Sequence, residues 1–160
     1  KCEQIARAEE GDRVEKLLPY LSFKGRANRQ RYWLTAMVLG ISLAVATILA
    51  MSFGVVGAGG GVPLIAVLFW AYLANAARRL HDRGKSAWWL LIMLPPIFVL
   101  EFLGGVAEAA TPGDGVVFTA LRLPFLIWAF VELGCLRGTE GENRFGPDPL
   151  QPLDVAEVFG

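Results

Sequence analysis

The stretch that decides the fold is Ala77-Arg78-Arg79-Leu80-His81-Asp82-Arg83-Gly84-Lys85-Ser86-Ala87-Trp88-Trp89, a polar interruption between two long apolar runs. The run before it contains no charged residue from position 32 to position 77. A soluble domain of this size does not readily bury such a run, whereas a membrane-spanning helix needs about 20 apolar residues. The whole chain is 54% hydrophobic with a mean hydropathy of +0.46, above the usual apolar share of globular domains. These features predict an all-α integral membrane protein.

Turn-forming residues divide the two apolar runs into four expected transmembrane helices. These spans cover about residues 33–53, 63–77, 87–106 and 116–136. Five glycines between positions 54 and 63 predict an uncharged loop between the first two spans. The second span is short, so we expect its helix to continue into the basic stretch. Pro95 and Pro96 lie at mid-depth in the third span, where they favour a kink over a break at a transport site.

The basic residues outside the spans lie on one side of the expected membrane. Those nearest the spans are Lys24, Arg26, Arg29, Arg31, Arg78, Arg79, Arg83, Lys85, Arg137 and Arg144. The opposite loops, 54–63 and 107–115, contain none. The positive-inside rule therefore predicts that both termini and the central stretch are cytoplasmic. We expect a membrane domain at 21–149, a cytoplasmic tail at 150–160, and at 1–20 a cytoplasmic lead-in or the end of another module.

Three ionisable residues lie inside the expected spans: Glu101, Arg122 and Glu132. A charge at the bilayer centre costs about 2.5–3.5 kcal/mol on insertion scales, so each is expected to have a partner. Glu101 and Arg122 come out at similar depth in the outer half of the membrane, which predicts that they pair. Glu132 lies near the inner end of the fourth span, where Arg78 or Arg79 is its expected partner. Two helix-pinning ion pairs are favoured over a proton or ion relay.

The usual catalytic and cofactor motifs are incomplete. Gly84-Lys85-Ser86 lacks the glycine that a phosphate-binding loop needs five positions before Gly84. Adjacent His81 and Asp82 do not by themselves have the geometry of an acid–base dyad, and Asp82 is expected to neutralise Arg26 or Arg29 instead. With one histidine and two distant cysteines, no metal site or other cofactor is expected. Zero net charge gives no support for a nucleic-acid partner.

Three motifs are similar to those of a known family. They are Phe23-x-Gly25-Arg26-x-x-Arg29-x-x-Tyr32-Trp33, then the stretch 77–89 quoted above, and Gly138-Thr139-x-Gly141-x-Asn143-Arg144-Phe145-Gly146-Pro147-Asp148-Pro149. Their order and spacing around four spans resemble the YhaH-like inner-membrane proteins, domain-of-unknown-function family 805, over about residues 21–149. The resemblance implies a bacterial inner-membrane location and supplies neither an activity nor catalytic residues.

All three motifs are expected on the cytoplasmic side, where we expect them to fold together as one cap. Glycines allow close backbone approach, and arginines bind carboxylates or phosphates through paired hydrogen bonds. The favoured function is non-enzymatic binding of an anionic lipid headgroup or a protein partner by Arg26, Arg29, Arg78, Arg79, His81, Asp82, Asn143 and Arg144. One alternative is a small transporter or channel component, as a homo-oligomer, using Glu101 and Arg122. The other is a membrane enzyme that acts on a phosphorylated lipid through His81 and Asp82.

Overall fold

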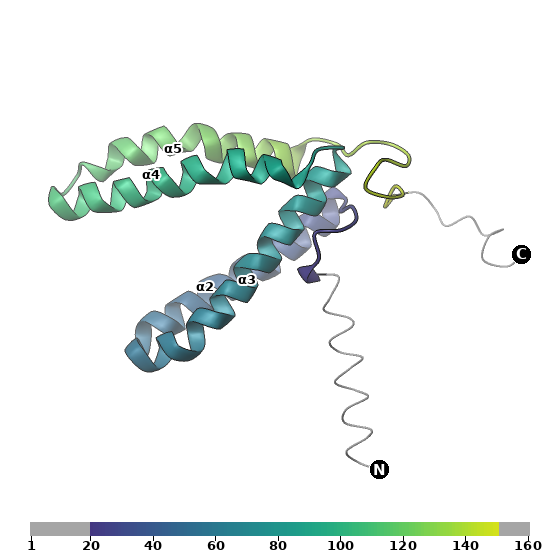
Figure 1. The fold of residues 1–160 in the computed structure, drawn as a ribbon. Coiled ribbons are helices and arrows are strands. Elements are labelled where there is room, and N and C mark those ends of the chain that lie inside the picture. Colours follow the sequence, from purple (N-terminus) through teal and green to yellow (C-terminus); the bar gives the residue numbers. More distant parts are fainter. Residues whose placement is uncertain (1–19, 151–160) are drawn as a thin grey trace, which may run out of the picture.

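The computed structural model of the protein describes residues 20–150, apart from the side chains of residues 54–60. The expected lead-in (1–20) and tail (150–160) therefore lie almost wholly outside the described residues. Four helices follow one another (Figure 1): α2 (Arg29–Ser52), α3 (Gly54–Asp82), α4 (Leu90–Ala110) and α5 (Gly115–Phe130). A 3-10 turn, η1 (Ala87–Trp89), precedes α4, and a π-helical turn, η2 (Val131–Cys135), extends α5.

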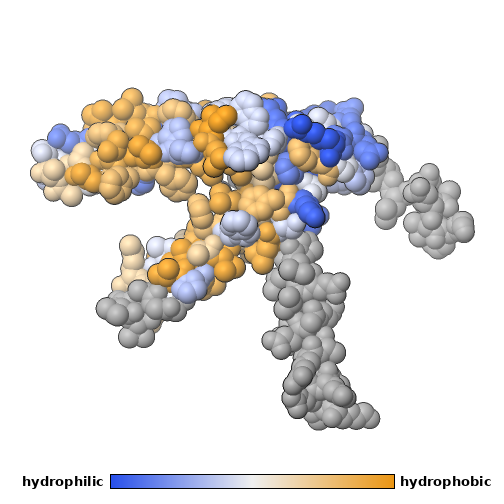
Figure 2. Space-filling view, in the orientation of Figure 1, coloured by the Kyte–Doolittle hydropathy of each residue, from blue (hydrophilic) through white to orange (hydrophobic). Residues whose placement is uncertain are grey.

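Four helical segments are long and apolar enough to cross a membrane, which confirms the expected number. They are Arg29–Ser52, Gly61–Asp82, Ala87–Ala110 and Gly115–Cys135. Over residues 20–150 the backbone forms no strand, and its one β-bridge joins Asn143 to Gly146. Apolar side chains cover much of the outer surface of the helices (Figure 2). This surface suits hydrocarbon, where every backbone polar group must be paired inside the helix.

The largest difference from the predicted helix boundaries is at residues 54–63. Residues 54–63 were expected to form a loop, but α3 begins at Gly54, directly after Phe53. Each glycine in a helix costs about 1 kcal/mol relative to alanine. An unpaired backbone N–H or C=O group in hydrocarbon costs several kcal/mol, so continuing the helix is the more favourable solution. As expected, α3 extends into the basic stretch and ends at Asp82. Helix α4 runs without a break through Pro95 and Pro96.

The helices form two antiparallel hairpins, α2–α3 and α4–α5, which diverge from a vertex beside η1 (Figure 1). The core lies at this vertex and consists of Tyr32, Ala36, Ala76, Ala77, Leu80, Leu90, Met93 and Leu133. A third of the α3 span is buried (33%), against 6% of the α2 span. Alanines on the buried face of α3, including Ala74 and Ala77, allow its neighbours to pack closely. Helix α3 is therefore the central element of the fold.

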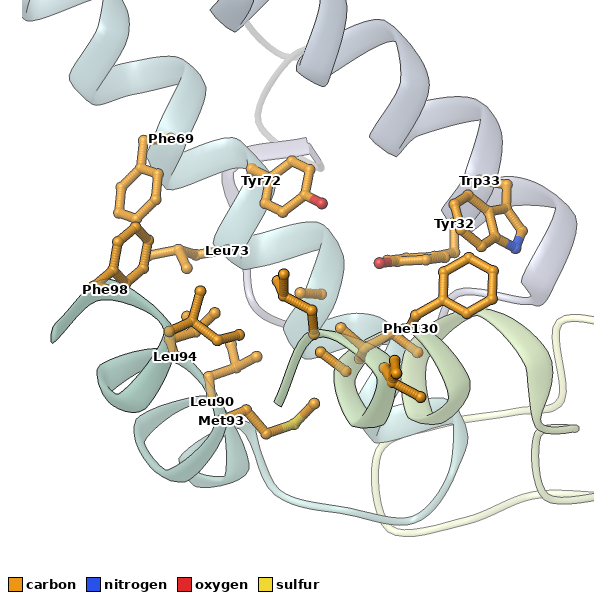
Figure 3. A pocket seen from close by; sticks show the side chains of 16 residues that line it. Tyr32, Trp33, Phe69, Tyr72, Leu73, Leu90, Met93, Leu94, Phe98 and Phe130 are labelled. Carbon is orange, nitrogen blue, oxygen red and sulfur yellow. The ribbon is translucent and has the colours of Figure 1, made fainter. Parts of the chain in front are cut away.

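Beyond the core, an apolar cavity of about 540 Å³ separates the hairpins (Figure 3). Phe69 of α3 and Phe98 of α4 meet edge to face across it, with 5.9 Å between ring centroids. The charged residues of the three motifs gather at the vertex, where the two hairpins meet (Figure 1).

Candidate functional site

Arg26 joins the three sequence motifs at the vertex. Its side chain is only 2% exposed, and its Nε donates to Asp82 Oδ1 at 3.1 Å. The two terminal nitrogens donate to backbone carbonyls of the third motif, at Thr139 (2.5 Å), Gly141 (2.6 Å) and Gly146 (3.3 Å). This confirms that the motifs fold together and that Asp82 neutralises Arg26. We call residues 23–31, 78–89 and 136–150 the cap.

Arg79 is the second buried guanidinium of the cap, and Asp82 binds it as well. Its Nη1 donates to Asp82 Oδ2 at 2.5 Å, so each carboxylate oxygen of Asp82 serves one arginine. The other Arg79 nitrogens donate to Leu133 O at 2.8 Å and to Leu136 O. These carbonyls lie at the end of η2, where no further helical turn follows whose N–H groups could donate hydrogen bonds to them. Arg79 therefore fastens the end of the fourth span to α3.

His81 and Asp82 do not form an acid–base dyad. The His81 ring nitrogen Nδ1 lies 3.2 Å from Gly25 O, and the ring stacks on Phe145 at 3.9 Å between centroids. Asn143 donates to the His81 carbonyl at 3.0 Å, and Arg144 donates to Gly84 O at 3.2 Å. Since Asp82 is engaged by Arg26 and Arg79, the two adjacent side chains have separate partners. His81 and Asp82 each help to hold the third motif against the end of α3.

The prediction for Glu132 was wrong. Its carboxylate Oε1 lies 2.8 Å from Lys85 Nζ and 3.1 Å from Arg83 Nε, and not beside Arg78 or Arg79. Arg79 uses its donors on carbonyls at the end of η2, while Arg78 lies over the Tyr20 ring and donates to Ala74 O. Glu132 itself is buried in η2, whose π-helical geometry changes the direction of its side chain relative to a regular helix.

Glu101 and Arg122 pair within the α4–α5 hairpin, as predicted. The side chain of Glu101 remains 62% exposed and that of Arg122 23% exposed. The pair lies well away from the cap, since α4 begins at Leu90 and rises about 1.5 Å per residue. It is a separate polar feature in the apolar part of the molecule.

Close packing in the cap depends on a glycine. A Cβ atom added to Gly138 would lie 2.0 Å from Asp82 Oδ2, well inside van der Waals contact. Gly84, which ends the turn after α3, has φ = +70°, a conformation that favours glycine. The glycines of the second and third motifs therefore have a structural explanation at the point where the motifs meet.

One cavity of the cap, of about 250 Å³, lies between the start of α2 and the third motif. Its charged lining consists of Arg29, Arg79 and Arg137 together with Asp82, Glu140 and Asp148. The backbone N–H groups of Leu150 and Gly141 donate to Asp148 and lower the pKa of that carboxyl below its usual value. Since three carboxylates match three guanidiniums, this cavity has no excess positive charge to attract an anion.

A second cavity, of about 300 Å³, lies at the first turn of α2 and has a different character. It is lined by Tyr20, Asn28, Gln30, Arg31, Leu34 and Thr35. Arg31 is exposed, and among the described residues no carboxylate lines this cavity. Asn28 caps α2 by accepting from Arg31 N at 2.8 Å, so the positive end of the helix dipole lies at the same place.

An apolar groove of about 490 Å³ lies beside this polar cavity, along α2 and α3. Its walls are Tyr20, Leu21, Leu34, Thr35, Val38, Leu39, Val67, Leu68 and Ala71. Tyr20, Leu34 and Thr35 line both spaces, which therefore adjoin each other. On α2 the lining changes from Arg31 to Val38 within two turns, from polar to apolar.

Sequence reasoning missed Arg31 as a site residue. It counted Arg31 among the cations before the first span but assigned it no binding role. The available signal was its spacing: Asn28, Arg31, Thr35 and Val38 recur every three or four residues and so share one face of α2. Among the described residues, no group of three or more His, Cys, Asp or Glu side chains is placed to hold a metal ion.

The helices and the cap define an all-helical membrane protein with a folded polar end. The chain belongs to the family described as Protein of unknown function (DUF805), whose model matches residues 20–147. This confirms the resemblance carried by the three motifs.

Curated relatives of the chain are inner-membrane proteins or uncharacterised. It is 34% identical over 145 residues to the inner membrane protein YhaH of Escherichia coli (strain K12), covering 87% of this chain and 97% of the relative. It is 27% identical over 136 residues to the inner membrane protein YhaI of the same organism, covering 81% and 87%. The uncharacterized protein YiiR is 29% identical over 133 residues, covering 79% and 85%. No solved structure matches the chain.

Proposed function

We propose that the protein is a non-enzymatic membrane protein that binds one anionic phospholipid at the start of α2. The phosphate of the headgroup lies in the polar cavity beside Arg31, and one acyl chain follows the groove between α2 and α3. The observation that carries this proposal is that a cationic cavity of about 300 Å³ adjoins an apolar groove of about 490 Å³, with three lining residues in common. A space with one charged end and one apolar end matches the shape of a phospholipid.

Electrostatics favour the α2 cavity over the other cavity of the cap. The α2 cavity combines the Arg31 guanidinium with the N-terminus of a helix, and both attract anions. The cavity beside the third motif has equal numbers of guanidiniums and carboxylates in its lining. An anion therefore binds more favourably in the α2 cavity than in the cavity beside the third motif.

The buried cap residues act in this proposal by positioning the binding site. Ala27, just before α2, donates from its N–H to Arg78 O at 3.1 Å and accepts from Arg79 at 3.4 Å. Asn75 donates to Tyr32 O at 3.1 Å and so ties the first turn of α2 to α3. Arg26, His81, Asp82, Asn143 and Arg144 hold the third motif against the same end of α3. The bonds of Ala27 and Asn75 hold the start of α2, which carries Arg31, against α3.

The proposal places the cap at the cytoplasmic surface, with both termini on that side. The support is the distribution of basic residues, which lie at the cap end of the helices and are absent from the expected opposite loops at 54–63 and 107–115. At this surface Arg31 lies at the level of the anionic headgroups of the inner leaflet.

The alternatives receive less support. The phosphorylated-lipid enzyme requires His81 and Asp82 to act together, but their side chains have separate partners. Transport at a broken helix requires an interruption at Pro95 and Pro96, but α4 is continuous there.

The test is native mass spectrometry of protein released from nanodiscs that contain phosphatidylglycerol and phosphatidylcholine. Arg31→Gln is compared with Lys24→Gln, because Lys24 is also exposed but lines neither space. A hydrogen bond to a charged group contributes about 1.5–3 kcal/mol, so Arg31→Gln should weaken retention of phosphatidylglycerol at least tenfold. Lys24→Gln should change it by no more than about fivefold, since one surface cation contributes about 1 kcal/mol near anionic lipid.

A second pair of variants tests the acyl-chain groove. Val67 lines the groove and is 52% exposed, so Val67→Trp should fill it and reduce lipid retention. Leu64 is 52% exposed but lies outside the lining, so Leu64→Trp is the control. Equal retention of phosphatidylglycerol by all variants, or retention of a polypeptide in place of a lipid, would contradict the proposal.

A further inference from the structure

The Glu101–Arg122 ion pair lies in the apolar part of the α4–α5 hairpin. Glu101 follows the start of α4 by eleven residues, about 16 Å along the helix axis. Arg122 follows the start of α5 by seven residues, about 10 Å. Both positions are inside segments that are long and apolar enough to span a membrane. The depth of the pair excludes the lipid headgroups as an ordinary environment for Glu101.

The pairing within one chain leaves this site incompletely covered. The Glu101 side chain is 62% exposed although it carries a charge at membrane depth. The Nε atom of Arg122 is buried and has no hydrogen-bond partner among the described residues. A carboxylate facing hydrocarbon is strongly unfavourable, and such residues in membrane proteins face other protein or water. The exposed side of the pair therefore requires a further polar partner.

The surface around the pair is a groove of about 310 Å³ formed by α4 and α5 alone. It is lined by Leu100, Glu101, Gly104, Gly105, Glu108, Gly115, Val116, Thr119 and Arg122. Gly105 is exposed, and a Cβ added to it would meet no atom within 4 Å, so another helix has room to approach it. Glu108 is already engaged, because it accepts hydrogen bonds from the N–H groups of Gly113 and Gly115.

The position of the groove leaves it open to a large partner. Glu101 lies one turn beyond Ile97 and Phe98, on the same face of α4, and these two residues line the cavity between the hairpins (Figure 3). The two hairpins diverge away from the vertex (Figure 1), and no described side chain of α2 or α3 belongs to the lining of the groove.

We propose that a second copy of this chain covers the groove, so that two α4–α5 hairpins meet around a two-fold axis along the membrane normal. Such an axis places α4 of one protomer opposite α5 of the other. Glu101 of each protomer then faces Arg122 of the other, because a two-fold interface joins each residue to its counterpart reciprocally. The two Glu101 and two Arg122 charges sum to zero and form a closed ring, while each Glu108 stays bound to the backbone N–H groups of its own chain. The pair Glu101–Arg122 is thus complementary to its own copy in charge, which a neutral lipid chain cannot match.

The first test uses rescue between chains. Glu101→Arg and Arg122→Glu are expressed separately and together, each with its own affinity tag. In a dimer, the groove with two arginines meets the groove with two glutamates, so co-expression should raise the membrane level of both variants at least threefold. The two tags should co-purify in detergent. Pairing confined to one chain predicts no rescue, because neither variant chain contains an opposite charge at these two positions.

The second test measures proximity in the unaltered charge background and does not depend on unstable variants. Cys2 and Cys135 are replaced by serine, and chains carrying Gly105→Cys and Thr119→Cys are co-expressed with different tags. Oxidation in native membranes should cross-link these chains, since both residues line the groove. The control pair is Val99→Cys and Leu121→Cys, which are exposed but lie outside the lining. Equal cross-linking of both pairs would overturn the dimer. The dimer would also be overturned if neither pair cross-linked and co-expression gave no rescue. That second outcome would leave water as the occupant of the groove.

Discussion

Replacement of Asp82 by asparagine should destabilise the protein more than the loss of an exposed hydrogen bond in the same cap. The Asp82 carboxylate gives one oxygen to Arg26 and the other to Arg79, and the three side chains are at most 4% exposed. The asparagine side chain would keep the shape but leave two buried guanidiniums without a counter-charge. Breaking a buried ion pair by removing one partner costs about 3–5 kcal/mol. We expect about 3 kcal/mol, the lower end, because Arg26 and Arg79 keep their backbone carbonyl acceptors.

The assay is reversible unfolding in detergent micelles, followed by tryptophan fluorescence. Trp33 donates to Gly134 O and Trp89 lies 4.5 Å from Lys85 Nζ, so both report on the cap region. A loss of 3 kcal/mol lowers the folding equilibrium constant by about 100-fold. The control is Arg144→Gln, which removes an exposed side chain that donates to Gly84 O and should cost less than about 1 kcal/mol.

A double-mutant cycle shows whether the cost comes from the uncompensated charges. Arg26→Gln in the Asp82→Asn background should cost less than Arg26→Gln in the wild type, because its counter-charge is already absent. Additive effects, or an Asp82→Asn cost no larger than that of Arg144→Gln, would refute the role assigned to the buried carboxylate.

Two further predictions concern the packing and the orientation of the cap. Gly138→Ala should cost about 1–3 kcal/mol, because its Cβ would lie 2.0 Å from Asp82 Oδ2 and force the carboxylate to move. Gly40→Ala, whose Cβ would meet nothing within 4 Å, should cost nothing, and equal costs in unfolding titrations would contradict the packing argument. For orientation, a membrane-impermeant maleimide should label Lys24→Cys in inside-out vesicles and Thr111→Cys in intact cells, in a background that lacks Cys2 and Cys135. The reverse labelling pattern would place the cap outside.

Much of the architecture could be predicted from the sequence because bilayer constraints act on long stretches. The absence of charge from 32 to 77 suffices to indicate membrane spans, and depth along a helix suffices to pair Glu101 with Arg122. The glycine run at 54–63 misled the prediction because propensity suggests a loop. Inside a membrane helix, however, backbone hydrogen bonding outweighs propensity.

The local geometry of the cap could not be predicted in the same way. Glu132 pairs with Arg83 and Lys85 from within η2, a π-helical turn, which is a feature without a reliable sequence signal. The cavity at Arg31 is formed by Tyr20 and the first turns of α2, and the groove beside it by α2 and α3, an arrangement that spacing along one helix does not encode. The sequence indicates which residues gather at the vertex, but not which of them remain exposed.

The carbonyl acceptors of Arg26 have a consequence for biosynthesis. Three of them belong to Thr139, Gly141 and Gly146, which are synthesised more than a hundred residues after Arg26 and after all four helices. The carbonyl acceptors of Arg79 at Leu133 and Leu136 are likewise synthesised late, after the fourth helix has begun. Until the fourth helix is inserted and the following segment returns to the vertex, both guanidiniums lack most of their carbonyl acceptors. They remain hydrogen-bonded to water at the end of α3 during that time. The cap therefore closes last, and a chain that stops at residue 138 would contain all four helices but leave Arg26 without its carbonyl acceptors and the vertex open to solvent and to proteases.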